Sequence, residues 1–192
     1  SIRHLWPLTD VLAPQSAGGL TVSGRPVVNL SLALNHAVGG LHVGGYHAVN
    51  LLIHVLAGLA LFGIVRRTLR LPALAGRFGP AALSLALAVA AAWTLHPLQT
   101  ESVTYVVQRA EALAGLFCLL TFYAFIRGAT ATSTPRVANR WFVASVAACA
   151  LAMASKESAA ATPLLVLLYD RALLGGTFRA AWSPLCNVCL GL

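Results

Sequence analysis

The feature that most constrains this chain is a series of long apolar runs whose charged residues lie only at their ends. The first clear run extends over residues 46–65, contains no acidic or basic residue, and is followed by Arg66, Arg67 and Arg70. At about 1.5 Å per residue, a helix of this length crosses the roughly 30 Å hydrocarbon core of a bilayer. The run therefore predicts a membrane span.

The composition indicates that most of the protein surface faces lipid and not water. Of the 192 residues, 58% are hydrophobic and 9% are charged, against roughly 25% charged in an ordinary soluble domain. In lipid, the backbone must satisfy its own hydrogen bonds, so a span is a helix or part of a closed barrel. The apolar runs lack the two-residue alternation of barrel strands. We predict an all-α, polytopic transmembrane helical bundle.

Glycine, proline and charged residues divide the chain into elements. Residues 1–25 are predicted to form an external loop, and 26–42, which begin with Pro26 and carry Asn29 and Asn35, an interfacial helix. Residues 46–171 are predicted to hold five spans, and 180–192 the start of a further one. The five predicted spans cover residues 46–65, 80–95, 112–126, 141–155 and 158–169.

The chain has a net charge of +8. Because successive spans cross the membrane in opposite directions, the charged residues between them can be assigned to one side or the other. Nine of the thirteen basic residues fall on one side: Arg66, Arg67, Arg70, Arg77, Arg127, Arg136, Arg140, Arg171 and Arg179. The positive-inside rule makes that side cytoplasmic. Four of the five acidic residues fall on the external side: Asp10, Glu101, Glu111 and Glu157. The basic excess therefore indicates topology and not a nucleic-acid partner.

Two short external connections, 96–111 and 155–158, gather the groups that could carry chemistry. They contain His96, Gln99, Glu101, Gln108, Arg109, Glu111, Lys156 and Glu157. Ionisable residues at membrane depth suggest a functional site. Arginine binds a phosphate through two parallel hydrogen bonds, lysine binds it as a point charge, and a carboxylate can act as a base. The alternative is structural: Arg109 with Glu111, or Lys156 with Glu157, would only anchor helix ends as ion pairs.

A second polar feature is the stripe His47, Asn50 and His54, whose spacing puts the three side chains on one face of the first span. That face should point into the bundle, either to hydrogen-bond other helices or to line a substrate path. No third ligand has an evident place beside it, so we expect no metal. Motifs for a phosphate loop, a zinc helix or a dinucleotide are absent, and we expect no cofactor.

Three stretches resemble a known family. They are GRPVVNLSLALNHAVGGLHVGGYHAVNLLIHVL, HPLQTESVTYVVQRAEALAGLF and SKESAAATPLLVLLYD, and they occur in the family's order over most of residues 24–171. They are similar to the GT-C glycosyltransferases, above all to the transmembrane, tetratricopeptide-repeat protein O-mannosyltransferases and their bacterial relatives. The predicted bundle of about five spans and an interfacial helix is accordingly GT-C-like.

The resemblance implies an enzyme of a bacterial inner membrane with an external active face. It would transfer a sugar such as mannose from a polyprenyl-phosphate carrier to a protein Ser or Thr, or to another acceptor, with the lipid-linked sugar as substrate and the bilayer as partner. The residues implied around the donor head group are Arg25, His96, Glu101, Arg109, Glu111, Lys156 and Glu157.

The resemblance also carries two departures. The family's acidic catalytic residues lie in its first external loop, at a position expected shortly before Ser1, and Asp10 lies too late in the loop to replace them. The repeat domain expected after the membrane region is not found. The competing interpretation is a non-enzymatic transporter or lipid-carrier flippase. That interpretation favours polar groups at mid-membrane in broken helices, whereas here they gather at the external ends.

Overall fold

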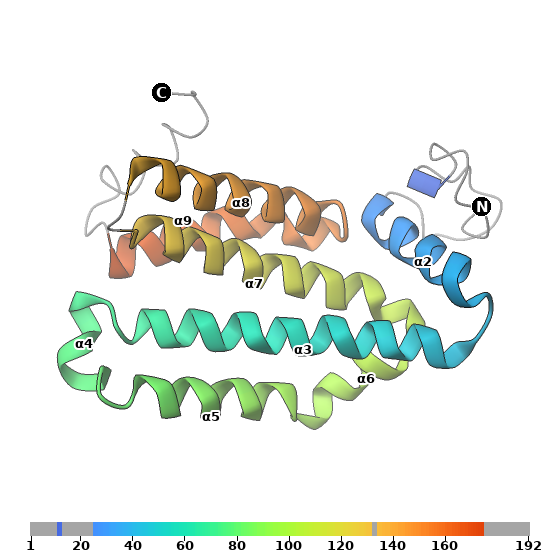
Figure 1. Ribbon diagram of the computed structural model, residues 1–192, viewed down its shortest axis with the longest axis horizontal. Helices are drawn as coiled ribbons and strands as arrows, with labels where there is room; N and C mark the ends of the chain where they lie inside the picture. The colour runs from blue at the N-terminus through green and yellow to red at the C-terminus, as the bar shows by residue number, and fades with distance from the viewer. Residues whose placement is uncertain (1–10, 13–24, 132–133, 175–192) are drawn as a thin grey trace.

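The computed structural model describes residues 11–12, 25–131 and 134–174, and within these ranges the regular structure is helical with no strand (Figure 1). The main helices are α2 (Pro26–Gly39), α3 (Val43–Thr68), α4 (Pro72–Phe78), α5 (Ala82–Thr94), α6 (Thr100–Thr104), α7 (Arg109–Ala129), α8 (Pro135–Met153) and α9 (Thr162–Leu173). Short 3₁₀ turns are η1 (Pro97–Gln99), η2 (Val106–Gln108) and η3 (Glu157–Ala161). The predicted all-α class is confirmed.

The long helices lie side by side as a bundle. Helix α3 packs between α5 and α7, and α7 also packs along α8 (Figure 1). Small residues allow these close approaches: a Cβ added at Gly58 would lie 2.4 Å from Thr94 Oγ1, and one at Gly128 would lie 2.9 Å from Phe142 Cε1. Close approach of backbones at small residues is typical of helices that associate in membranes, where dispersion and hydrogen bonding replace the hydrophobic effect.

The number of spans is matched only roughly. Two segments, Val43–Thr68 and Val106–Ala129, are long and apolar enough to cross a bilayer. A third span is present if α4 and α5, which meet at a 94° bend, form one broken span. Helix α9 has only 12 residues, and α8 carries Arg136 and Arg140 near its start, so neither meets that standard alone. The described residues thus contain two or three clear spans where the sequence predicts five.

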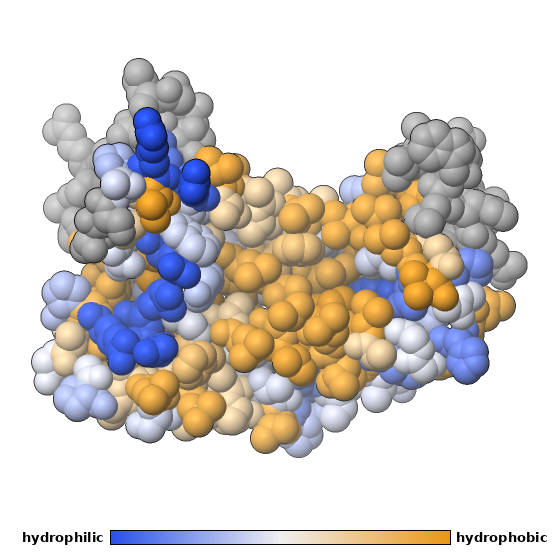
Figure 2. All heavy atoms as spheres, viewed as in Figure 1, coloured by the Kyte–Doolittle hydropathy of each residue, from blue (hydrophilic) through white to orange (hydrophobic). Residues whose placement is uncertain are grey.

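The two ends of the bundle differ in charge. Helices α3, α7 and α9 begin at one end, which α2 also flanks, and they finish at the other (Figure 1). We call the first the α2 end and the second the arginine end. Figure 2 shows strongly hydrophilic side chains gathered at the arginine end and an apolar surface over the middle of the bundle. Residues 1–10 and 13–24 of the predicted loop, Arg179 and the predicted span at 180–192 lie outside the described residues.

Candidate functional site

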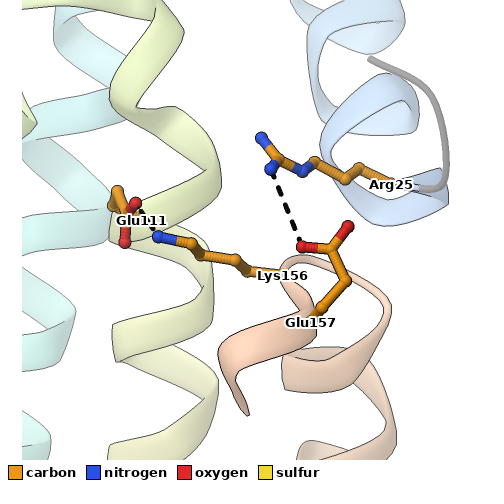
Figure 3. A network of polar contacts seen from close by, with 4 residues as sticks. All are labelled: Arg25, Glu111, Lys156 and Glu157. Atoms are coloured by element: carbon orange, nitrogen blue, oxygen red, sulfur yellow. Dashed lines mark hydrogen bonds and ion pairs between the residues drawn. The ribbon is translucent and has the colours of Figure 1, made fainter. Parts of the chain in front are cut away.

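Four charged side chains from three segments meet at the α2 end (Figure 3). Lys156 Nζ donates a hydrogen bond to Glu111 Oε1, and Arg25 Nη2 lies 3.7 Å from Glu157 Oε2. We call these four residues the charged cluster. The sequence offered Arg109–Glu111 and Lys156–Glu157 as anchoring pairs, but the structure pairs each of these two glutamates with a different cation. Both pairs join separate segments of the chain, so the cluster depends on the tertiary fold.

Local structure places each member of the charged cluster at the start of a helix. Pro26 opens α2 directly after Arg25, Glu111 lies in the first turn of α7, and Glu157 begins η3. Lys156 precedes η3 in an extended conformation, with φ −158° and ψ 137°, which directs the chain away from the end of α8. Helix starts expose unpaired backbone N–H groups and a partial positive charge, both favourable to a phosphate.

The charged cluster is open to its surroundings. The side chains of Arg25 and Lys156 are 23% and 26% exposed, and that of Glu157 is 73% exposed. Exposed ion pairs contribute little stability, about 0–1 kcal/mol each. The two pairs therefore contribute little to stability, and their two cations are partly exposed.

Arg109 lies nearby but is fully buried, with 0% of the residue exposed. Its Nε donates to Asn50 Oδ1 at 2.8 Å, and its Nη2 donates to Asn35 Oδ1 at 3.0 Å and to the Tyr46 carbonyl at 2.9 Å. Its Nη1 reaches the Ser31 carbonyl at 3.4 Å. These acceptors belong to α2 and α3, so the guanidinium of α7 joins three helices.

The polar stripe of α3 also makes contacts inside the bundle. His47 Nδ1 and Asn50 Nδ2 each lie 3.4 Å from the Val103 carbonyl, and His54 Nε2 lies 2.9 Å from the Thr94 carbonyl. His54 stacks on Trp93 with ring centroids 5.1 Å apart. In the described part of the chain, no three His, Cys, Asp or Glu side chains gather as a metal site would require.

His96 and Glu101 lie at the same end of the bundle, but no contact that the structure describes joins them to the charged cluster. His96 Nδ1 accepts a hydrogen bond from Leu98 N and closes a turn. Glu101 is exposed on the short helix α6, which packs against α3 and α7. The sequence did not reveal Asn35 and Tyr46 as partners of Arg109; the polar residue Asn35 within an apolar helix was the one available signal.

Together, the helices and the charged cluster define a polytopic helical membrane protein with an ionic site at one end of its bundle. The chain is 32% identical over 156 residues to the protein O-mannosyl-transferase TMTC2 of Mus musculus, a match that covers 77% of this chain. It is 32% identical over 189 residues to Tmtc2 of Drosophila melanogaster, covering 95% of the chain, and 30% identical over 165 residues to human TMTC4, covering 80%.

These relatives confirm the predicted resemblance: the chain is homologous to a segment of the TMTC protein O-mannosyl-transferases. It spans only part of their length, 16% of the mouse relative and 18% of the Drosophila relative. No family model matches the chain. No solved structure matches it either.

Proposed function

We propose that this chain forms part of the donor site of a membrane glycosyltransferase that transfers mannose from a polyprenyl-phosphate carrier to a protein Ser or Thr hydroxyl. The observation that carries the proposal is the charged cluster, which the fold assembles from three segments where helices begin. The sugar and the protein acceptor come from the names of the homologous mannosyltransferases. The carrier lipid contains a phosphate, and Arg25 and Lys156 of the charged cluster could bind this anion.

In this proposal, Lys156 and Arg25 bind the donor phosphate, and Glu111 and Glu157 hold the two cations in place before the donor arrives. Transfer proceeds by direct displacement: an acidic base takes the proton of the acceptor hydroxyl, and the cations stabilise the charge on the departing phosphate. Because Glu111 and Glu157 already face cations, we assign the base to neither of them.

Arg109 receives a positioning role, because its donors are directed to oxygens of α2 and α3. By fixing α2, it fixes the helix that begins directly after Arg25. We assign no phosphate contact to His96 or Glu101 in this proposal, because no contact that the structure describes joins either side chain to the charged cluster.

The proposal is tested by replacing Lys156 with Ala in the full-length protein and measuring mannose transfer from a polyprenyl-phosphate donor in membranes. Loss of one charge-assisted contact to phosphate is expected to lower transfer about tenfold or more. Arg136→Ala, which removes an exposed cation of α8 at the arginine end, is the matched control and should leave transfer unchanged. Normal transfer by a correctly inserted Lys156→Ala protein would exclude Lys156 from the donor site.

We also propose that the α2 end of the bundle faces the external or lumenal side. The support is the asymmetry of the described basic residues, of which Arg66, Arg67, Arg127 and Arg140 are examples at the opposite end. In a cysteine-free background, Cys introduced at Gln99 is expected to react with an impermeant maleimide added outside, whereas Cys at Ala131 should react only after permeabilisation. The reverse pattern would invert the topology.

A further inference from the structure

At the arginine end, two guanidinium groups from different helices share one aromatic ring. Arg67 of α3 lies with its Cζ 4.8 Å from the centroid of Tyr123, and Arg127 of α7 lies 6.0 Å from the same centroid. Arg127 also lies 4.0 Å from the centroid of Trp141 on α8. Two guanidiniums from different helices therefore contact the same tyrosine ring, and that of Arg127 also contacts a tryptophan ring.

The position of these rings is set by helix packing and not by the arginines. A Cβ added at Gly63 would lie 2.5 Å from Tyr123 Cε2, so the tyrosine ring rests directly on the backbone of α3. Tyr123 and Trp141 meet edge to face with centroids 6.2 Å apart. Both guanidiniums contact this ring pair and are partly exposed. Cation–π contacts attract each arginine to the rings, but the rings do not neutralise the two positive charges.

The arginine end is short of anionic groups. Among the described residues, its one acidic residue is Asp170, which is buried at 5% exposure. Neither Arg67 nor Arg127 makes an ion pair within the described part of the chain. Exposed Arg70, Arg136 and Arg140 add to the local positive charge, and Figure 2 shows a strongly hydrophilic surface at this end of the bundle. Charge complementarity calls for an external anion at this place.

We propose that Arg67 and Arg127 bind the phosphate of an anionic glycerophospholipid, with Trp141 and Tyr123 as the aromatic base of the site. Arginine forks match phosphate oxygens, and basic pockets between membrane helices are suited to lipid head groups. The occupant is a lipid and not free phosphate because Arg67 and Arg127 lie in the last turns of α3 and α7, the two helices long and apolar enough to span a bilayer, which puts the site at the level of lipid head groups. This lipid site is separate from the donor site at the opposite end.

The test measures the lipids retained by the full-length protein after purification from vesicles that contain equal amounts of phosphatidylglycerol and phosphatidylcholine, by native mass spectrometry. The wild-type protein is expected to retain phosphatidylglycerol over phosphatidylcholine by roughly tenfold. Arg67→Gln with Arg127→Gln should abolish the preference. The control pair Arg70→Gln with Arg136→Gln removes the same charge from exposed arginines of the same end and should retain most of it.

Three outcomes would overturn the proposal. A wild-type protein without preference would do so whatever the variants show, and this measurement does not depend on variant folding. Equal losses in the two double variants would reduce the effect to general surface charge. Complete displacement of the lipid by millimolar inorganic phosphate would show that the acyl chains contribute nothing to recognition.

Discussion

Replacing Arg109 by Leu is expected to lower the free energy of unfolding by about 2–6 kcal/mol, because a buried acceptor left without its donor costs about 1–3 kcal/mol and two buried amide oxygens are affected. The substitution leaves Asn35 and Asn50 with amide oxygens that have lost their donor inside the bundle. The carbonyls of Tyr46 and Ser31 lose a donor as well. Thermal unfolding of the purified protein in detergent, followed by circular dichroism, measures the loss.

The matched control for this prediction is Arg140→Leu, because Arg140 is exposed at the start of α8 and should change stability little. Arg109→Lys tests the geometry, because a lysine keeps the charge but lacks the planar guanidinium that donates to acceptors on both α2 and α3. The decrease in its free energy of unfolding should lie between those of Arg109→Leu and Arg140→Leu. If Arg109→Leu unfolds at the wild-type temperature, the guanidinium does not hold α2 on the bundle.

The sequence predicted the helical elements well wherever one physical signal was strong. The uncharged run of residues 46–65 lies within α3, and the apolar run of 112–126 lies within α7. In both cases a long apolar stretch has only one low-energy backbone in lipid, the helix. The structure extends both helices beyond the apolar runs, because Arg67 continues α3 and Arg127 continues α7 into the charged end.

The sequence did not predict how the helices break or which side chains meet. Pro72 opens α4, and a 94° bend separates α4 from α5. The apolar pattern of these residues does not predict the angle between the two helices. The neighbours Glu111 and Arg109 looked like partners, yet Arg109 turns into the bundle and Glu111 pairs with Lys156. Burial and partner choice depend on contacts between segments 45 or more residues apart, which local spacing does not encode.

A double variant that exchanges the charges of Glu111 and Lys156 is expected to regain the stability that Lys156→Glu alone loses, but not its mannose transfer. Lys156→Glu alone puts two carboxylates together and should lower mannose transfer about 100-fold, the usual effect of removing one group that stabilises transition-state charge. Glu111→Lys added to it rebuilds the ion pair in reverse. Because a surface pair contributes at most about 1 kcal/mol, the stability of the double variant should return close to that of the wild type.

The double variant distinguishes between two roles of the charged cluster, anchoring of helices and binding of the donor phosphate. If the pair only anchors α7 to η3, the exchanged pair anchors them equally well and transfer recovers with stability. If Lys156 binds the donor phosphate, the cation has moved to α7 while a carboxylate stands at position 156, so transfer stays low in a well-folded protein. Lys156→Arg, which keeps a cation in place and can still pair with Glu111, should retain most of the transfer and serves as the control.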